Sequence, residues 1–334
     1  MLEQTLPTAT RVRAPQAVRG AGMVALGTAI PERVVTSAEI AATLGIEEEW
    51  ILARTGIRER RRAEPDALLS DYAAAAGRMA LERGGVAPED VDLVLVATMS
   101  QDQLTPNAAP IIAHQIGATR AGAIDVGAAC TAWLSGVALA SSYVETHRAD
   151  HVLVIGADMI GRFTDPTDRG TYPLFSDGAG AVLVSPAAGR GRMGPVILGA
   201  DGAEGPTLYG DWHDRILHMD GPRVFKHAVM RMKDATVEAL AAADLEVEDV
   251  DLFVYHQANA RILKAIGDRL GIEERKLVST IETLGNNSAA TLPIALAAAE
   301  ADGRLVEGAR VLLSAFGAGF TWGATVVEWG LGDA

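Results

Sequence analysis

The sequence predicts an α/β protein built from two similar halves. Short β-rich segments alternate with segments of helical periodicity along most of the chain, which is typical of helices packed on sheets. The chain also repeats itself at an offset of 159 residues. Three separate matches share this offset: Glu89–Leu93 with Glu248–Leu252, Ala80-Leu81 with Ala239-Leu240, and Val152–Val154 with Val311–Leu313. A common shift at three places indicates a duplication, and therefore two halves related by an approximate twofold axis.

Helices are predicted in pairs, one member in each half. Apolar residues at helical spacing predict a helix over 69–85 and its counterpart over 224–243. Alanine-rich segments predict a second pair, over 131–147 and 288–301, because alanine is the best helix former. Each half therefore supplies two helices to cover its strands.

Strands are predicted at equivalent places in the two halves. Short β-rich segments at 91–97 and 250–255 are each entered through a Glu-Asp pair. Two further pairs of strands close the halves: 151–156 with 310–315, and 179–185 with 323–329. Each half then has the order helix, strand, helix, strand, strand.

The chain divides into a tail and two halves. Residues 1–20 are rich in Thr, Pro, Ala and Arg and lack apolar periodicity, so we expect a flexible N-terminal tail. Residues 21–186 form the predicted first half and residues 187–334 the second. No low-complexity linker separates them, so we expect the halves to pack as one unit.

Composition and charge exclude several classes of protein. Hydrophobic residues make up 49% and charged residues 22% of the chain, as in ordinary globular proteins. A formal charge of −14 argues against binding to nucleic acid or to an anionic membrane. No apolar run is long enough to cross a bilayer, and no signal peptide opens the chain. The single cysteine excludes an internal disulfide and favours the reducing cytoplasm, and no Cys/His spacing predicts a metal site.

The single cysteine, Cys130, lies where a nucleophile would be useful. The strand Ala123–Val126 is followed by a turn of small residues and then by the predicted helix, so Cys130 lies near a helix N-terminus. There the helix dipole would favour a thiolate, and free N–H groups could stabilise an oxyanion formed by attack on a thioester. The alternative is a small apolar residue in the core.

The repeat predicts which residues meet Cys130. At the offset of 159, Cys130 corresponds to Ala289, and Ala97, at a strand end, corresponds to His256. If the halves face each other, Cys130, His256 and the turn at 285–288, which contains Asn286, should converge near the pseudo-axis. The alternative interpretation of His256 is a structural, hydrogen-bonded histidine, and that of the turn at 285–288 is an ordinary helix cap.

Taken together, these segments resemble β-ketoacyl-acyl-carrier-protein synthase III, the initiating condensing enzymes of the thiolase superfamily. The resemblance covers about residues 21–330. The matching motifs are Glu49–Arg58, Ala128–Cys130, Asp165–Gly170, Asp177–Gly180, His256–Asn259, Gly285-Asn286 and Gly317–Gly323. It implies the thiolase-like fold, in which two duplicated α/β halves stack as α-β-α-β-α layers.

The resemblance also implies the chemistry. Cys130 would take an acyl group from coenzyme A as a thioester, with the backbone N–H groups of Cys130 and Ala318 forming an oxyanion hole. His256 and Asn286 would form a second oxyanion hole for a malonyl thioester bound to an acyl carrier protein. Loss of CO₂ would give an enolate that attacks the acyl-cysteine, yielding a β-ketoacyl product for fatty acid or polyketide initiation. No permanently bound cofactor is expected; the coenzyme A thioester is a substrate.

Further positions match family residues that bind the two substrates. Trp50 and Arg169 would stack on the adenine of coenzyme A, and Arg54 would contact its phosphates. Lys226, Arg261 and Lys264 fall where the family docks its acidic carrier protein. The resemblance also implies a homodimer. Solvated surface charges and ordinary packing are the alternative interpretations of these residues.

Departures from the family pattern concern the acyl pocket. Thr131-Ala132-Trp133 stands where Ala-Gly-Phe is usual, and Thr105 stands where a pocket-lining Phe often crosses the dimer. With Phe316, the expected pocket residues are therefore Thr105 and Trp133. These changes leave the acyl starter open: acetyl, longer, branched, aromatic or polar.

Three other functions remain open from the sequence. A related acyltransferase would move the acyl group from Cys130 to an alcohol or amine without condensation. A papain-type hydrolase uses the same three residue types, but the duplication argues against it. A non-catalytic binding protein would not need Cys130, His256 and Asn286 together.

Overall fold

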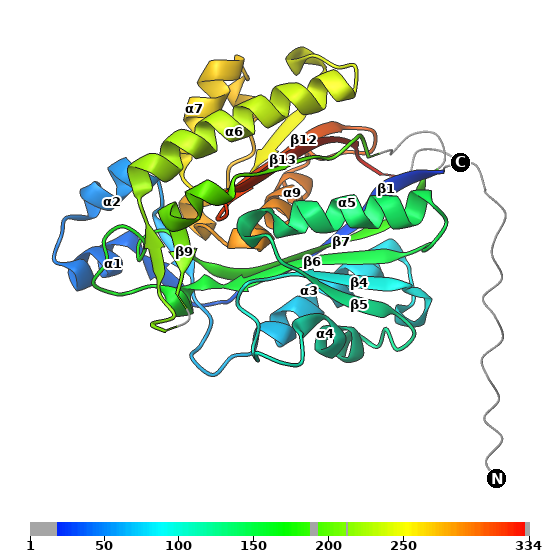
Figure 1. The fold of residues 1–334 in the computed structure, drawn as a ribbon, viewed down its shortest axis with the longest axis horizontal. Helices are drawn as coiled ribbons and strands as arrows, with labels where there is room; N and C mark the ends of the chain where they lie inside the picture. The colour runs from blue at the N-terminus through cyan, green and yellow to red at the C-terminus, as the bar shows by residue number, and fades with distance from the viewer. Residues whose placement is uncertain (1–18, 188–192, 212, 331–334) are drawn as a thin grey trace, which may run out of the picture.

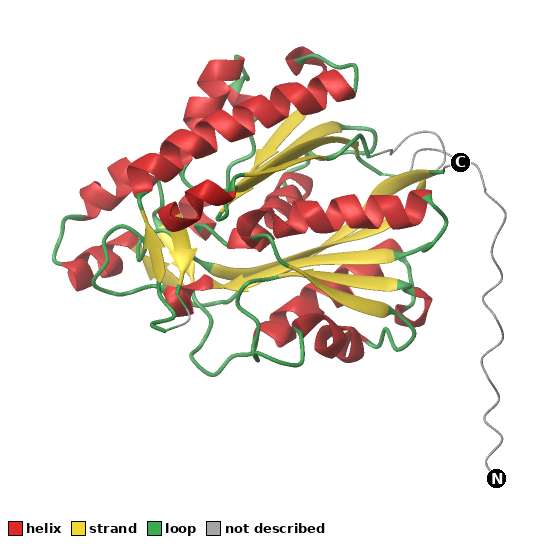
Figure 2. Ribbon diagram, viewed as in Figure 1, coloured by secondary structure: helices red, strands yellow, loops and turns green. Residues whose placement is uncertain are grey.

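The computed structural model describes residues 19–187, 193–211 and 213–330. Helices and sheets stack as alternating layers, α-β-α-β-α, with helices on both outer faces and between the two sheets (Figures 1 and 2). The predicted α/β class and thiolase-like layering are therefore confirmed. The tail predicted for residues 1–20 lies outside the described residues except for Arg19 and Gly20, and Gly20 already begins strand β1.

The first half contains a five-stranded sheet. In spatial order its strands are β1 (Gly20–Ala29), β7 (Asp177–Ala187), β6 (Val152–Met159), β4 (Leu93–Ala97) and β5 (Gly122–Val126). Strands β4, β5 and β6 are parallel, whereas β7 runs antiparallel to both β6 and β1. Strands β4 and β6 are buried along their whole length, which explains their near-continuous apolar sequence.

The second half contains a four-stranded sheet. Its spatial order is β11 (Leu252–Tyr255), β12 (Arg310–Gly317), β13 (Thr321–Glu328) and β8 (Ile197–Ala200). The order matches β4-β6-β7-β1 of the first sheet, and at the place of β5 the second sheet has only an isolated parallel bridge between Leu277 and Phe253. All strands predicted from the repeat are present, within a few residues of the expected bounds.

The duplication extends to individual hydrogen bonds. Leu93 pairs with Val152 in the first sheet, and their equivalents Leu252 and Val311 pair in the second. The Asp92 N–H donates to the His151 carbonyl at 3.0 Å, and the Asp251 N–H donates to the Arg310 carbonyl at 2.9 Å. The internal repeat is therefore a structural one.

Two helices separate the sheets. Helix α5 (Ala132–Glu145) and helix α9 (Thr291–Ala301) begin 159 residues apart, at equivalent positions. Both are mostly buried, and their alanine-rich sequences let the two sheets approach closely. Both begin after a short 3-10 turn, Ala129–Thr131 and Ser288–Ala290, because the chain must bend sharply at the sheet edge before it can become helical. The helices predicted over 131–147 and 288–301 therefore start slightly later than expected.

Outer helices cover the far face of each sheet. Helix α3 (Leu69–Gly84) and helix α4 (Ala108–Ile116) pack on the first sheet, and α6 (Gly221–Ala242) and α7 (Ala260–Leu270) pack on the second. Helix α6 begins three residues before the predicted helix because the Asp220 side chain accepts the Arg223 N–H and caps it.

A small lobe extends the first half towards α7. It contains β2 (Val34–Thr36), α1 (Ser37–Leu44), α2 (Glu48–Thr55) and β3 (Glu59–Arg61). The fully buried Arg60 fixes the lobe by donating hydrogen bonds to the Ser37 hydroxyl and to the Val35 and Pro173 carbonyls. Three short elements lie in the second half: β9 (Leu208–Gly210), β10 (Leu217–Met219) and α8 (Ile281–Leu284).

Candidate active site

Residues from both halves line one cavity of about 660 Å³. Cys130 comes from the turn before α5, His256 from the end of β11, and Asn286 from the turn before α9. The three residues that the sequence predicted to converge therefore do so at one cavity. The cavity extends outwards to Trp50, Arg54 and Arg169.

The turn that holds Cys130 is strained and tightly packed. Ala129 has a φ of 46°, a left-handed conformation that a residue with a Cβ rarely adopts. The Thr131 hydroxyl donates to the Ala128 carbonyl at 2.8 Å and lies 2.8 Å from the Thr321 hydroxyl. A Cβ added at Gly317 would lie 2.9 Å from the Cys130 nitrogen, so only glycine lets β12 approach this turn. These contacts fix the direction of the cysteine side chain.

The electrostatics of Cys130 differ from the expectation. The sulfur reaches the cavity, but the protein atoms around it exclude most water, and this burial raises the pKa of the thiol to about 11. The nearby Asp158 carboxylate adds to the increase, while a contact with the Ser288 hydroxyl at 3.5 Å opposes it. The expected preference for a thiolate at the helix terminus is therefore not met, because burial raises the pKa of the thiol.

His256 is held as a neutral imidazole. Its backbone N–H donates to the Ser314 carbonyl at 2.8 Å, which extends the β11–β12 pairing by one residue. Burial lowers the pKa of the ring to about 3. Nδ1 lies 2.6 Å from the Thr291 hydroxyl, so one ring nitrogen is engaged by the first residue of α9.

Asn286 is fixed through both its backbone and its side chain. Its N–H donates to the Leu174 carbonyl at 3.1 Å, and its carbonyl accepts the Ser176 N–H at 2.8 Å. Its side-chain Oδ1 accepts the Ser288 N–H at 2.9 Å. Because the oxygen is engaged, the amide group can offer its NH₂ protons to a ligand oxygen.

Two buried polar residues lie beside the cavity: Ser288, which the sequence placed in the converging turn without a role, and Asp158, which it did not single out. Ser288 has a φ of 51° and begins the turn before α9, and Asp158 lies near the end of β6. Asp158 accepts hydrogen bonds from the Met99 and Ala289 N–H groups, and both Ser288 and Asp158 are nearly inaccessible to solvent. A carboxylate at the end of the apolar segment 152–157 was the available signal.

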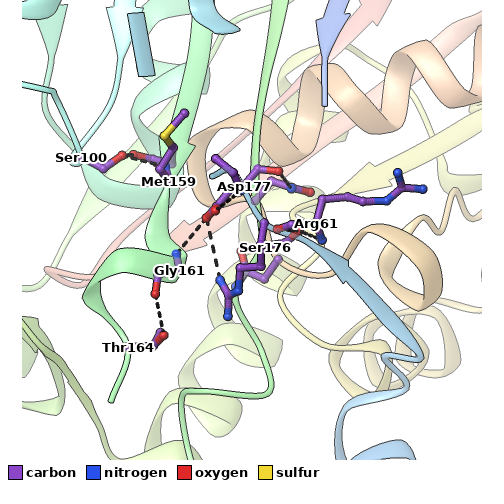
Figure 3. Close-up of polar contacts among 12 residues, drawn as sticks. Arg61, Ser100, Met159, Gly161, Thr164, Ser176 and Asp177 are labelled. Carbon is purple, nitrogen blue, oxygen red and sulfur yellow. Dashed lines mark hydrogen bonds and ion pairs between the residues drawn. The ribbon is translucent and has the colours of Figure 1, made fainter. Parts of the chain in front are cut away.

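A second buried carboxylate, Asp177, orders the start of β7 (Figure 3). It accepts the Gly161 N–H at 2.9 Å and the Ala63 N–H at 2.9 Å, and it lies 3.8 Å from the Arg62 guanidinium. Its backbone carbonyl accepts the Asn287 side-chain NH₂ at 3.0 Å. The Asp177–Gly180 motif therefore supports the turn at 285–288 rather than lining the cavity.

The outer cavity has aromatic and cationic groups in contact. The Arg54 guanidinium lies 4.3 Å from the centre of the Trp50 ring, and that of Arg169 lies 5.7 Å from it. A base inserted between Trp50 and Arg169 needs about 7 Å, two stacking distances, so these groups must separate slightly to admit it. The roles of all three residues stay predictions.

The expected docking residues lie around the cavity opening. Arg261 lines the cavity and lies 5.3 Å over the Phe225 ring. Lys226 is exposed on α6. Lys264 on α7 is exposed and forms a 2.9 Å ion pair with Asp268. The structure contains no carrier protein, so docking stays a prediction.

Phe316 is the one of the three expected pocket residues that lines the cavity. Trp133 does not: it is fully buried between the sheets, and its ring N–H donates to the Val154 carbonyl at 3.3 Å. The helix start turns this ring towards β6, so Trp133 is a core residue. Thr105 is exposed and lies outside the cavity of this chain. Ala318 follows Gly317, which lines the cavity.

Residues 19–187, 193–211 and 213–330 contain neither a metal-binding cluster nor a membrane-spanning helix. Nowhere in those ranges do three or more His, Cys, Asp or Glu side chains group so that they could hold a metal ion. None of the helices in the same ranges has the length and hydropathy needed to span a bilayer.

The fold and the cavity define a thiolase-fold enzyme with a cysteine at the base of its site. Two family models match the chain: 3-oxoacyl-[acyl-carrier-protein] synthase III over residues 124–202, and the C-terminal part of the same synthase over residues 240–329. A β-ketoacyl-[acyl-carrier-protein] synthase III from Listeria innocua is 39% identical over 310 residues, which cover 93% of this chain and 99% of the relative. The protein belongs to the β-ketoacyl-acyl-carrier-protein synthase III family.

Solved structures agree with this assignment. The synthase III of Thermus thermophilus is 42% identical with a TM-score of 0.89, and the match covers 93% of this chain and 99% of that one. The priming β-ketosynthase of the R1128 polyketide pathway is 36% identical with a TM-score of 0.91, covering 97% of this chain and 100% of that one.

Proposed function

We propose that this enzyme condenses an acyl-CoA with a malonyl-acyl-carrier protein, releasing CO₂ and forming a β-ketoacyl product. The observation that supports this most is the meeting of a thiol, a neutral imidazole and a carboxamide at one cavity. Each half of the duplicated fold contributes what the other lacks, so the reaction needs both. The relatives named synthase III, at about 40% identity over nearly the whole chain, support the same reaction.

In the first step Cys130 becomes acylated. The sulfur attacks the thioester carbonyl of the acyl-CoA, the new S–C bond forms, and the bond from that carbon to the coenzyme A sulfur breaks. The backbone N–H groups of Cys130 and Ala318 stabilise the oxyanion of the tetrahedral intermediate. Trp50, Arg54 and Arg169 hold the nucleotide part of coenzyme A at the outer end of the cavity.

In the second step His256 and Asn286 stabilise an enolate. Both offer N–H groups to the thioester oxygen of the malonyl group as CO₂ leaves. The Thr291 hydroxyl lies 2.8 Å from the Ser288 carbonyl and 2.6 Å from Nδ1 of His256. For His256 to offer an Nε2 proton to the substrate, this hydroxyl donates to Nδ1 in place of the carbonyl. The enolate carbon then attacks the acyl carbon on Cys130: a C–C bond forms, the bond from that carbon to Sγ breaks, and the sulfur takes up a proton as the product leaves.

Fatty acid and polyketide initiation both fit this reaction. The similarity to a priming β-ketosynthase of a polyketide pathway supports the second, and the similarity to synthase III enzymes supports both. Arg261 and Lys226, beside the cavity opening, dock the acidic carrier protein. We place the reaction in the cytoplasm, because a chain with a single cysteine suits a reducing compartment.

We also propose a homodimer formed along the edge of the first sheet. Strand β5 lies at that edge, whereas the equivalent edge of the second sheet has only the isolated bridge between Leu277 and Phe253. Ile124 on β5 is 45% exposed and Leu104 in the neighbouring loop is 72% exposed. An unpaired edge with apolar side chains invites a second copy. Light scattering tests this: Ile124→Lys should shift a dimeric mass towards the monomer, and a monomeric wild-type protein would contradict it.

A two-stage assay tests the proposed reaction. After incubation with a panel of acyl-CoAs, mass spectrometry should find one acyl group on Cys130, and adding malonyl carrier protein should then release CO₂ and clear the adduct. Cys130→Ser should form no stable adduct. Neither an adduct nor CO₂ with any starter would overturn the proposal.

Transfer to an alcohol or amine remains the second candidate, because it would use the same acyl-cysteine. The engaged Oδ1 of Asn286 favours condensation, since it orients the NH₂ group as an oxyanion donor. Asn286→Ala should reduce the condensation rate about 10²–10³-fold and leave acylation of Cys130 nearly unchanged. A transferase would lose little with this variant.

A further inference from the structure

A carboxylate lines the outer part of the cavity, where the proposed ligand is itself anionic. Asp168 lies in the loop that leads into β7, and it lines the cavity together with Arg169 and Gly170. The nucleotide part of coenzyme A carries phosphate groups, and like charges in one site oppose binding. A neutral residue would avoid this repulsion, so the presence of Asp168 calls for an explanation.

The side chain of Asp168 is turned back onto its own loop. Oδ1 accepts the Gly170 N–H at 2.8 Å, and Oδ2 accepts the Thr171 hydroxyl at 2.6 Å and the Thr171 N–H at 3.1 Å. Thr171 is fully buried, so its hydroxyl has no water to bond instead. A Cβ at Gly170 would lie 3.1 Å from Oδ1, so glycine there leaves room for the carboxylate. Both oxygens are therefore occupied by donors from the two residues that follow Arg169.

The backbone of Asp168 is also held on both sides. Its N–H donates to the Asp165 carbonyl at 3.0 Å, and its carbonyl accepts the Tyr172 N–H at 3.1 Å. Tyr172 and Trp50 pack against the same small apolar cluster of the lobe. Asp168 therefore fixes the loop around Arg169 and connects this loop to the element that carries Trp50.

These bonds keep Asp168 from neutralising the cation beside it. The Arg169 guanidinium lies 5.7 Å from the centre of the Trp50 ring. None of the ion pairs found in the described part of the chain includes Arg169. Without its loop contacts, the Asp168 carboxylate could pair with Arg169 and draw it away from the ring. The guanidinium instead keeps its charge and its place beside Trp50.

We propose that Asp168 is a positioning residue that holds Arg169 beside the Trp50 ring for the base of coenzyme A. It acts through the loop backbone, and its own oxygens do not contact the ligand. An ordered loop loses less conformational freedom when the base binds, which offsets the repulsion between the carboxylate and the phosphates. This inference rests on the proposed function, because it assumes that the nucleotide part of coenzyme A binds at Trp50 and Arg169.

Two acyl donors separate positioning from other roles. Acyl-CoA carries the nucleotide, whereas the same acyl group on pantetheine lacks it. The second-order rate constant for acylation of Cys130 is measured with each donor by mass spectrometry. With acyl-CoA, Arg169→Ala should lower this constant about tenfold and Asp168→Ala about fivefold, because stacking of the guanidinium on the base is lost or weakened. With acylpantetheine, both variants should stay within about twofold of the wild type.

The other outcomes for Asp168→Ala overturn the positioning role. A larger constant with acyl-CoA would mean that the Asp168 charge only repels the phosphates. Equal slowing with both donors would mean that Asp168 only supports the fold of the cavity. An unchanged constant with both donors would mean that the loop holds Arg169 without it.

A double variant tests whether Asp168 acts through Arg169. Introduced into Arg169→Ala, Asp168→Ala should cost less than about twofold with acyl-CoA, because the side chain that it positions is already absent. A further fivefold loss would overturn the inference. Thr171→Val is an independent variant, which removes the hydroxyl that donates to Oδ2 and should lower the acyl-CoA constant about threefold. The wild-type value in Thr171→Val would overturn the inference even if Asp168→Ala failed to fold.

The matched control is Asp165→Ala, which removes a carboxylate from the same loop. Its Oδ1 accepts the Thr167 N–H and the Thr167 hydroxyl, each at 2.8 Å, and bonds to neither residue that follows Arg169. Both rate constants of this variant should stay within about twofold of the wild type. A loss equal to that of Asp168→Ala would mean that any change in the loop has the same effect, and would overturn the inference.

The same measurements separate failure of this inference from failure of the proposed function. A wild-type protein that acylates Cys130 with neither donor would overturn the proposed function. An unchanged preference for acyl-CoA over acylpantetheine in Arg169→Ala would overturn the proposed role of Arg169. A reduced preference in Arg169→Ala, with an unchanged one in Asp168→Ala, would overturn the positioning role alone.

Discussion

The two turns that begin α5 and α9 occupy equivalent places in the duplicated fold but have different tasks. Ala129 and Ser288 correspond and share a left-handed backbone, with φ of 46° and 51°. Each turn rests on the central strand of the opposite half: the Cys130 turn on Gly317, and the Ser288 turn on Asp158. Gly317 and Asp158 are themselves equivalent positions, 159 residues apart.

The comparison shows how one backbone conformation, repeated in the two halves of the fold, can support two different steps of a reaction. Beneath Cys130 the strand has no side chain, which leaves room for the sulfur and keeps a carboxylate away from direct contact. Beneath the other turn the strand carries Asp158, which accepts the Ala289 N–H. At the strand end, Ala97 in the first half is His256 in the second. The two turns therefore share their backbone geometry, whereas the side chains around them differ and give the two turns different chemical roles.

The largest loss of acylation is expected when the thiol is moved from the Cys130 turn to the equivalent turn of the second half. In the double variant Cys130→Ala, Ala289→Cys the thiol stands where the residue is only 1% exposed. Its neighbour would be the Asp158 carboxylate, which disfavours a thiolate. We expect no detectable acyl-cysteine by mass spectrometry, with the melting temperature measured as the folding control. An adduct on residue 289 would show that the two turns are interchangeable.

Adding a side chain beneath the Cys130 turn should have the next largest effect. In Gly317→Ala the new Cβ would lie 2.9 Å from the Cys130 backbone nitrogen, and backbone must shift to accommodate it. A misplaced nucleophile and oxyanion hole should slow acylation about 100-fold in single-turnover assays.

The matched control for Gly317→Ala is Gly127→Ala. A Cβ at Gly127, three residues before Cys130, would meet no heavy atom within 4 Å. We expect its acylation rate to stay within about threefold of the wild type. Equal rates for the two alanine variants would show that close approach of β12 is unimportant.

The buried imidazole should make the second half sensitive to acid. Burial lowers the pKa of His256 from 6.5 in an unfolded chain to about 3, so between these values the unfolded chain binds more protons. Stability contributed by the neutral ring is therefore complete above pH 6.5 and is lost as the pH falls. The free energy of unfolding should drop by roughly 3 kcal/mol between pH 6.5 and 4 from this group.

Urea unfolding of the wild type and of His256→Gln over this pH range measures the contribution. The variant should have a flatter pH dependence, because glutamine does not titrate. If the free energy of unfolding depended on pH in the same way for both proteins, the pKa of His256 would not be lowered by folding. The ring would then reach solvent or have a charged partner.

The smallest effects are expected among the surface cations. Lys264 is engaged by Asp268, whereas Arg261 lines the cavity over Phe225. Arg261→Ala should therefore raise the KM for malonyl carrier protein about fivefold, and Lys264→Ala less than twofold. Steady-state kinetics at low and high salt measure both. A larger effect of Lys264→Ala would place the docking surface further along α7.

Prediction from sequence succeeded where the duplication could be used. The offset predicted the paired strands, the two central helices and the convergence of Cys130 with His256 and Asn286, because equivalent segments must face each other across a pseudo-axis. It failed for Trp133, since the direction of a ring at a helix start depends on packing against β6. It also missed Asp158, which lies far from the turn at 285–288 in the chain and contacts Ala289 only when the halves meet.

The sequence by itself determined the layered α/β architecture and the three side chains that meet at the cavity, because periodicity and repetition are properties of the chain. The tertiary structure alone decided the charge state of those groups. Burial raises the pKa of the Cys130 thiol, lowers that of the His256 imidazole, and raises that of the Asp158 carboxyl group near the sulfur. Each pKa depends on how much water the packed halves exclude, and neighbours along the chain do not specify that quantity.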